Sequence, residues 1–322
     1  MVLSTMAAAL RKVALVGGFG KLGSHILTAL HADATLDVTV ITRHTSSATF
    51  PPNTKVVKVS DGYPTSEMVS AFRDQHAVVL CLGFAGDKYH DSLVESSIKA
   101  GVKHLVASAY GGSESKEAIE LFPIAARKGR MVEELRTRET PGWSWTAITC
   151  GLFFDLYAPP SALSSFINEI QLYLQRLFRL RPSCPQSHDL GFGQCGILRH
   201  ERGYNRRSVA KVLAKPEATA NRRVYISSFE TSLNKILEAY KKATGVADWD
   251  VNHVKWDVEV ASGKEMMKTG NMWGMGKLAL AVEVKEGFGA DFEKAGLLDN
   301  ELLGIKRGDV EATVARVLKE KL

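Results

Sequence analysis

Cysteine is scarce in this chain, and long apolar runs are absent. The four cysteines include no C-x-x-C pair, so the sequence indicates neither a disulfide framework nor a common zinc-finger spacing. No stretch is long and apolar enough to span a bilayer, and the basic residues near the start follow the apolar part, unlike those of a secretory signal. We therefore expect a cytoplasmic protein with reduced thiols and no membrane partner.

Acidic residues are outnumbered by basic ones, which raises the possibility of a nucleic-acid-binding protein. The chain has 41 Lys and Arg against 35 Asp and Glu, a net charge of +6. Most of this excess is local, because the segment between Glu169 and Arg207 contains seven arginines and only three acidic residues. That distribution argues against a basic face spread over the fold, so we expect no nucleic-acid partner. Binding through the arginine cluster remains a weaker alternative.

Glycine, in contrast, is concentrated where a phosphate-binding turn needs it. The apolar run Lys12–Val16 precedes a glycine-rich loop, and residues 22–30 then have the apolar spacing of a helix. This strand–loop–helix order is the context that G-x-G-x-x-G requires to bind a dinucleotide pyrophosphate at a helix N-terminus. A glycine-rich turn without a ligand is the alternative. The predicted cofactor-binding residues of the loop are Gly17, Gly18, Phe19, Gly20, Lys21, Leu22 and Gly23.

The residue that ends the second predicted strand distinguishes NADP from NAD. Residues 37–42 are apolar and β-branched, and Arg43 follows them, where an NAD-preferring site would carry Asp or Glu. A guanidinium can hold a 2′-phosphate through two hydrogen bonds, and His44 and Ser46 could add donors. We therefore predict NADP as the cofactor, with a solvated arginine as the alternative.

Strands and helices alternate through the first half of the chain. Apolar runs separated by helices predict an α/β fold, a Rossmann-type doubly wound parallel sheet covered on both faces. The predicted strands are 12–16, 37–42, 56–59, 77–82, 104–107 and 145–150, and the predicted helices are 22–30, 65–73, 89–100, 124–138.

The second half predicts a smaller C-terminal α+β substrate domain. Its expected elements are a strand over 224–228, a helix over 232–244, another strand within 249–260 and a closing helix over 309–322. We therefore divide the chain into an NAD(P)-binding domain at 11–155, an atypical segment at 156–207 and the C-terminal portion at 208–322.

The atypical segment differs in character from the rest. Its apolar residues between Leu163 and Leu177 have helical spacing, and a lid-like insertion or an error in the gene model would each explain it. The segment also carries two cysteines and two histidines, whose spacing is not that of a standard finger, so we predict no metal site. These residues are Cys184, His188, Cys195 and His200.

Several stretches together form a known pattern. They are Val16–Gly23, Ile41–Arg43, Ala100–Ser108, Lys128 before a helix, Trp145–Ile148 with Gly151–Phe153, Tyr225–Phe229, Gly287–Phe292 and Leu297–Gly304. Through them the chain resembles the NmrA-like atypical short-chain dehydrogenases/reductases, of the isoflavone reductase-like fungal type, over about residues 11–155 and 208–322. The resemblance implies a dinucleotide-binding fold with a small substrate domain, and usually NADP(H).

The catalytic groups are expected beyond the carboxyl ends of the strands, where Gly83 and Phe84 would also contact the cofactor. The usual Tyr-x-x-x-Lys pair is absent, because Ile124 stands four residues before Lys128. The resemblance nevertheless implies a proton-transferring role for Lys128, whose pKa would fall on partial burial. A solvated lysine in a cationic cluster is the alternative. Ser108 would support the acid, and Tyr110 is a rival proton donor.

These residues predict an NADP-dependent oxidoreductase that reduces a C=O or conjugated C=C bond of a small apolar molecule. The resemblance extends this prediction to a role in secondary-metabolite biosynthesis. The family that the chain resembles usually carries an acidic residue near this position, where this chain has Ala109. A non-catalytic, dinucleotide-sensing regulator is the alternative function, and the sequence does not predict an oligomeric state.

Overall fold

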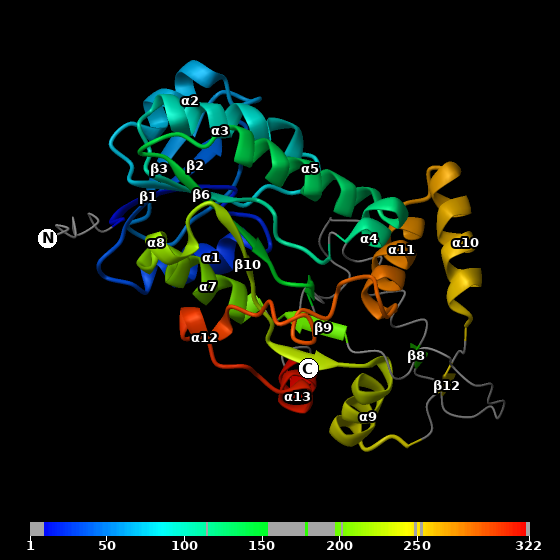
Figure 1. The fold of residues 1–322 in the computed structure, drawn as a ribbon. Coiled ribbons are helices and arrows are strands. Elements are labelled where there is room, and N and C mark those ends of the chain that lie inside the picture. The colour runs from blue at the N-terminus through cyan, green and yellow to red at the C-terminus, as the bar shows by residue number, and fades with distance from the viewer. Residues whose placement is uncertain are drawn as a thin grey trace, which may run out of the picture.

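A seven-stranded parallel sheet organises the chain in the computed structural model, which describes residues 10–113, 115–153, 178–179, 197–200, 202–247, 250–251 and 254–319. The strand order is β10-β6-β5-β4-β1-β2-β3, so the direction of winding reverses between β1 and β4 (Figure 1). This confirms the doubly wound fold predicted from the alternating apolar runs. The strands are β1 (Lys12–Val16), β2 (Asp37–Arg43), β3 (Lys55–Val59), β4 (Ala77–Leu80), β5 (His104–Ala107), β6 (Ser144–Thr149) and β10 (Arg222–Tyr225).

Helices cover both faces of this sheet, because alternate residues of each buried strand point to opposite sides. Val13 and Leu15 of β1 pack in the cluster that includes α1 (Gly23–His31) and α7 (Arg202–Ala214). Ala14 and Val16 pack on the other face. The helices on that second face are α2 (Thr65–Phe72), α3 (His90–Lys99) and α5 (Pro123–Thr137) (Figure 1).

The remaining elements lie mainly beyond the carboxyl ends of the strands (Figure 1). Three short strands form a second sheet in the order β11-β9-β7, and β8 pairs with β12. The elements are the 3-10 helix η1 (Asp87–Tyr89), α4 (Lys116–Leu121), β7 (Leu152–Phe153), β8 (Phe178–Arg179), β9 (Ile197–His200), α8 (Pro216–Thr219), β11 (Phe229–Thr231), α9 (Leu233–Thr244), β12 (Asp250–Val251), α10 (Trp256–Lys268), α11 (Trp273–Val284), α12 (Asn300–Leu303) and α13 (Val310–Lys319). Among the residues described, no helix combines the length and apolarity needed to cross a membrane.

Two features of the second half differ from the sequence-based expectation. The strand expected within residues 249–260 is reduced to Asp250–Val251, and α10 begins at Trp256 instead. β10 pairs in parallel with β6, so the large sheet takes its edge strand from a part of the chain assigned to the substrate portion. The predicted boundary at residue 155 therefore does not coincide with the edge of the sheet.

Helices α10 and α11 pack unusually closely through two glycines. A Cβ at Gly274 would lie 2.3 Å from the carbonyl oxygen of Gly263 and 3.0 Å from the Cβ of Met266. A Cβ at Gly263 would in turn lie 3.2 Å from the carbonyl oxygen of Gly274. The two helices then bury apolar residues against α4 and the start of α5, including Leu121, Val260 and Leu278. This pair therefore supports the helix that carries Lys128.

Replacing Gly274 with alanine tests this packing. The added methyl group meets backbone, which cannot rotate away, so we expect the free energy of unfolding to fall by about 2–3 kcal/mol. Denaturant unfolding of Gly274→Ala measures the loss. Lys264→Ala, an exposed position on α10, is the control and should change stability by less than about 0.5 kcal/mol. Equal stability of Gly274→Ala and the unsubstituted chain would show that the helices are less closely packed.

Candidate active site

The glycine loop after β1 is fixed by contacts between backbone atoms. Gly17 has a φ of +85°, and a Cβ there would lie 2.2 Å from the carbonyl oxygen of Cys81, just beyond β4. A Cβ at Gly23 would lie 2.0 Å from the carbonyl oxygen of Gly17. Both positions therefore require glycine because of packing within the protein, and the loop is held against the end of β4.

Gly20 faces a different environment. A Cβ there would have one near neighbour, the carbonyl oxygen of Gly17 at 3.3 Å, so protein atoms would allow a side chain. The helix that follows begins at Gly23, and among the described residues no side chain caps its N-terminus. An uncapped N-terminus leaves N–H donors and a positive dipole end for an anion. The loop thus fits the pyrophosphate of a dinucleotide.

The other residues predicted to bind the cofactor divide into two groups. Gly18 lies against Leu15 and Val40, and Leu22 packs on the core, so these two support the loop from inside. Phe19 is 59% exposed, and its ring meets that of Phe50 edge-on at 6.4 Å. Lys21 is partly exposed at the same turn.

Arg43 is exposed at the end of β2, the strand next to β1. Its side chain lies near Tyr63, whose pKa is raised by burial and lowered in part by the Arg43 charge. Arg43 therefore lies at the carboxyl end of β2, the strand beside the one that leads into the glycine loop. This is where a ribose 2′-phosphate is expected in such folds.

The ends of β4 and β5 are joined by Ser108. Its hydroxyl accepts a hydrogen bond from the Leu82 N–H at 2.9 Å and donates one to the Leu82 carbonyl oxygen at 3.2 Å. Ser108 is 1% exposed, so it is a link between two strand ends. Gly83 follows with open space around it, and Phe84 is 54% exposed beneath the Arg127 guanidinium, 5.5 Å from the ring centre.

Tyr110 lies in the core and not at the surface of the site. Its hydroxyl has no hydrogen-bond partner among the described residues, and its ring belongs to the apolar cluster around β1. Burial raises the pKa of Tyr110, and the nearby Cys81 and Cys150 raise it further. A buried phenol of raised pKa holds its proton strongly, and so Tyr110 is poorly suited as the rival proton donor.

Lys128 of α5 is largely buried beside the strand ends. Its side chain is 11% exposed, and Nζ donates a hydrogen bond to the carbonyl oxygen of Ser108. Burial lowers the pKa of Lys128, and the negative charge of Asp87, 3.6 Å from Nζ, raises it in part. The alternative of a solvated lysine is therefore wrong. Its neighbours in sequence differ from it, because Arg127 is partly exposed and Arg130 is exposed.

Two buried polar residues near Lys128 were not predicted from the sequence. Asp87 starts η1, and its side chain is 4% exposed. His90 starts α3 and is 2% exposed, with its Nδ1 3.5 Å from Asp91 Oδ1. Burial raises the pKa of Asp87 and lowers that of His90, since desolvation disfavours either charge. The available sequence signal was the polar run from Asp87 to Asp91, which follows the apolar and glycine residues after β4.

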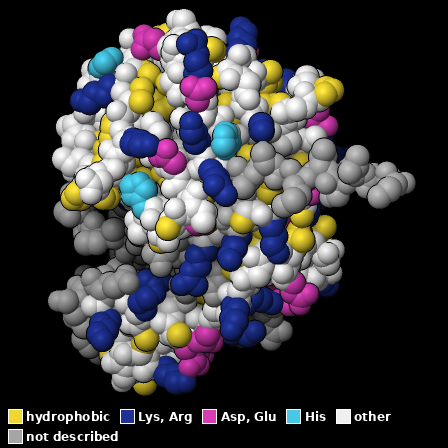
Figure 2. Space-filling model, turned by 90° about the vertical axis from the view of Figure 1, so that its left-hand side faces the viewer, with side chains coloured by type: hydrophobic (Ala, Val, Ile, Leu, Met, Phe, Trp, Pro, Cys, Tyr) yellow, Lys and Arg dark blue, Asp and Glu magenta, His cyan; other side chains and the backbone are white. Residues whose placement is uncertain are grey.

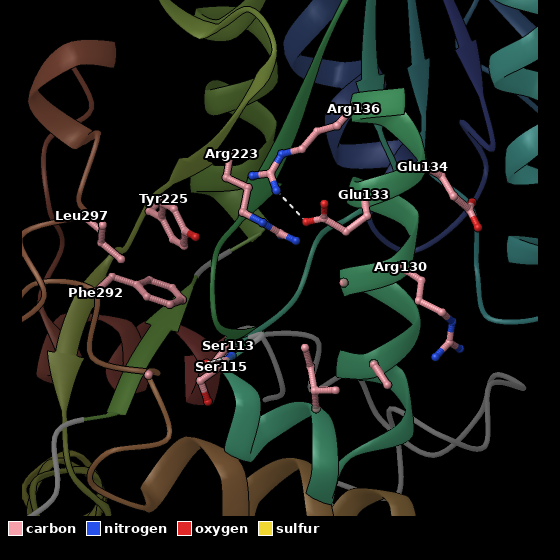
Figure 3. Close-up of a pocket in the computed structure, with 14 residues that line it drawn as sticks. Ser113, Ser115, Arg130, Glu133, Glu134, Arg136, Arg223, Tyr225, Phe292 and Leu297 are labelled. Atoms are coloured by element: carbon pink, nitrogen blue, oxygen red, sulfur yellow. Dashed lines mark hydrogen bonds and ion pairs between the residues drawn. The ribbon is translucent and has the colours of Figure 1, made fainter. Parts of the chain in front are cut away.

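A separate pocket of about 650 Å³ lies on another side of α5 (Figure 3). Arg130, Glu133 and Arg136 line it from α5, and Arg223 and Tyr225 line it from β10. Glu133 pairs with Arg136 at 2.5 Å, and the Arg223 guanidinium reaches the Thr149 hydroxyl at 3.4 Å. None of the predicted site residues is among the residues that line this pocket, so the candidate site does not include it.

Some expectations fall outside the described residues. The predicted helix between Leu163 and Leu177 lies there, as do Cys184, His188 and Cys195, while β9 places only the backbone of His200. Within the described part of the chain, no three His, Cys, Asp or Glu side chains are grouped as metal ligands would be. Figure 2 shows Lys and Arg side chains at many places on one face, so cations outside the Glu169–Arg207 segment are also prominent.

Known proteins resemble this chain over the residues that form this site. Residues 17–159 match a family model described as NAD(P)H-binding. The oxidoreductase aprR of Aspergillus flavus is 28% identical over 310 residues, which cover 96% of this chain and 99% of that protein. The oxidoreductase poxI of Penicillium oxalicum is 27% identical over 320 residues, covering 93% of this chain and 91% of that protein.

Solved structures share the fold over nearly the whole chain. AtPrR2 with NADP+ and (+)pinoresinol superposes with a TM-score of 0.70 at 17% identity, covering 96% of this chain and 99% of that one. Leucoanthocyanidin reductase of Vitis vinifera, in a binary complex with NADPH, gives a TM-score of 0.67 at 14% identity, with the same coverage. The dinucleotide-binding fold expected from the resemblance is confirmed, and the chain is similar to oxidoreductases and NADPH-binding reductases over nearly its whole length.

Proposed function

We propose that the chain uses NADPH to reduce a C=O or conjugated C=C bond of a small, largely apolar molecule, with Lys128 as the proton donor. One observation carries this proposal. The Lys128 ammonium is buried at the carboxyl ends of β4 and β5, hydrogen-bonded to the Ser108 carbonyl, next to the strand end that holds the glycine loop. A lysine so placed, with its pKa lowered by burial, gives up its proton more readily than a solvated lysine.

The residues that would hold the cofactor are those that leave room for it. Gly20 and the uncapped N-terminus of α1 would face the pyrophosphate, and Arg43 would bind the 2′-phosphate. When bound, NADPH supplies a hydride, the two electrons and one hydrogen of the reduction. Gly83 and the exposed Phe84 would border the nicotinamide half, because they follow β4.

The chain supplies the second hydrogen as a proton. As the substrate carbon is reduced, negative charge develops on its oxygen or on the far atom of the conjugated system, and Lys128 Nζ gives its proton there. Nζ is then a neutral amine and regains a proton from water. Ser108 contributes its carbonyl oxygen, which orients Nζ, while its own hydroxyl holds the two strand ends together.

An apolar substrate fits the surroundings of this lysine. Phe84 is exposed, and Phe153 of β7 is partly buried against the core. We propose that the C-terminal portion, with α10 and α11 packed on α4 and α5, forms the substrate side. The names of two structural neighbours, a pinoresinol complex and a leucoanthocyanidin reductase, favour an aromatic molecule. The resemblance given by the sequence extends this proposal to secondary metabolism.

Removing the arginine of β2 tests the preference for NADPH. Arg43→Ala loses a charge-assisted contact to the 2′-phosphate, so we expect the Kd for NADPH to rise about tenfold or more while that for NADH stays unchanged. Fluorescence titration with both nucleotides measures this. Arg11→Ala removes an exposed arginine just before β1, at the amino ends of the strands, and should change neither value. An unchanged NADPH affinity in Arg43→Ala would leave Arg43 as a solvated residue.

Alanine substitutions at Gly20 and Gly23 are expected to affect different properties, nucleotide binding in the first case and stability in the second. Gly20→Ala adds a methyl group on the open side of the loop, so the Tm should stay close to the original while the Kd for NADPH rises about tenfold or more. Gly23→Ala places its methyl group against the Gly17 carbonyl and should lower the Tm itself. Thermal unfolding without nucleotide, followed by titration, separates the two effects. Equal nucleotide affinity in Gly20→Ala would contradict the proposed pyrophosphate position.

Lys128→Ala tests the proton donor. Turnover of a reducible substrate should fall about 10²–10⁴-fold, as for loss of a general acid, while NADPH binding is retained. For the unsubstituted chain, kcat should fall as pH rises through the pKa of Lys128, because only the protonated amine donates. Lys99→Ala on the exposed side of α3 is the control. Undiminished turnover in Lys128→Ala would exclude Lys128, and NADPH binding without turnover on any carbonyl or enone would favour the sensor.

A further inference from the structure

We propose that Asp87 is a positioning residue for Lys128, and that its carboxylate keeps the buried ammonium charged until a proton is needed. This inference rests on the proposed function, because it concerns the same lysine. The Asp87 carboxylate pairs with Lys128 and Arg127, so we expect Asp87 to act through Lys128.

Backbone hydrogen bonds place Asp87 at this point. After β4 the chain turns, with the Gly86 and Asp87 N–H groups both donating to the Gly83 carbonyl oxygen at 2.8 and 3.1 Å. The turn leads directly into η1, which begins at Asp87. The aspartate is therefore held between the end of β4 and α5, where its carboxylate meets two consecutive cations.

The Asp87 carboxylate makes ion pairs and does not cap the backbone N–H groups of η1. Oδ1 lies 3.6 Å from Lys128 Nζ, and Oδ2 lies 3.6 Å from Arg127 Nε. Oδ1 has no hydrogen-bond partner among the described residues. Leaving a buried carboxylate oxygen unbonded is costly, and a neutral residue of the same size would pack at lower cost. The favourable interaction with the ammonium offsets this cost.

Among the residues that the structure describes, four titratable groups interact with Lys128 from the elements packed around it. They are Asp87 at the start of η1, Cys81 after β4, His90 on α3 and Arg127 beside it on α5. Burial raises the pKa of Cys81 to about 12 and lowers that of His90, so both are neutral between about pH 7 and 10. The charges that act on Lys128 in this range are therefore the carboxylate of Asp87 and the guanidinium of Arg127.

These two charges act on Lys128 in opposite directions. The carboxylate favours the protonated amine and raises the pKa of Lys128, whereas the guanidinium repels it and lowers that pKa. Removing Asp87 should thus move the deprotonation of Lys128 to lower pH, and removing Arg127 should move it to higher pH. A residue that merely filled space would move it in neither direction.

The experiment compares Asp87→Asn with Arg127→Gln in the full chain. In Asp87→Asn we expect the alkaline limb of kcat to move down by about one pH unit, and in Arg127→Gln we expect it to move up. The second readout needs no turnover. Amine-reactive labelling of Lys128 across pH, followed by peptide mass spectrometry without nucleotide, should show the same two shifts in its midpoint.

Asp91→Asn is the matched control, because Asp91 is also an acidic residue beside His90 but its side chain is 57% exposed. It should leave the activity, the alkaline limb and the labelling midpoint unchanged. NADPH affinity should be unchanged in Asp87→Asn, which shows that the variant still folds.

The outcomes separate this inference from the proposed function. If Lys128→Ala abolishes turnover while Asp87→Asn shifts neither the limb nor the labelling midpoint, Lys128 remains the donor and the role of Asp87 is refuted. If Lys128→Ala keeps full turnover, the proposed function fails, although the labelling midpoint still reports whether Asp87 controls the protonation of Lys128. A downward shift in Asp87→Asn together with an upward shift in Arg127→Gln establishes the inference.

Discussion

The site depends on one close approach of backbone to backbone, between the glycine loop and the end of β4. Gly17 lies so near the Cys81 carbonyl that a Cβ would meet its oxygen at 2.2 Å, and a Cβ at Gly23 would meet the Gly17 carbonyl oxygen at 2.0 Å. Next along the chain, the Ser108 hydroxyl binds the backbone of Leu82, and the Ser108 carbonyl accepts from Lys128. The phosphate loop and the lysine are thus connected through the ends of the neighbouring strands β4 and β5.

Burial then decides which group can move a proton. Tyr110 lies just after β5, and the Lys128 side chain is hydrogen-bonded to Ser108 at the end of the same strand. Desolvation shifts the pKa values of these two residues in opposite directions. A buried phenol is neutral when protonated, so burial strengthens its hold on the proton; a buried ammonium is charged when protonated, so burial weakens it. The same low-polarity surroundings therefore raise the pKa of Tyr110 and lower that of Lys128. The negative charge of Asp87 opposes the lowering at Lys128.

Much of the fold and the cofactor loop could be predicted from the sequence, because these features are local. Buried parallel strands are apolar runs, and the glycine loop lies between a strand and a helix that are adjacent in sequence. Helix α11 escaped prediction because nearly all of its residues are buried and no polar face marks the helical period. At the start of α10 the sequence pattern favoured a strand within residues 249–260 instead. Asp87 escaped prediction for another reason. Its proposed role depends on its ion pairs with Arg127 and Lys128, which are about forty residues away in sequence, and no spacing along the chain indicates such a contact.

The C-terminal helices have a place in the chemistry although no proposed reacting group lies on them. α11 packs Leu278 with Leu121 of α4 and Ala125 of α5, and the Glu283 carboxylate lies against Gly112, where a Cβ would meet Oε1 at 1.9 Å. The loop after β5 is thus enclosed by the same helix that supports the start of α5. Because Lys128 lies one turn further along α5, a shift of α11 would move both the loop that orients Nζ and the helix that carries it. Substitutions that change the shape of the C-terminal side are therefore expected to alter the protonation and aim of Lys128 along with the choice of substrate.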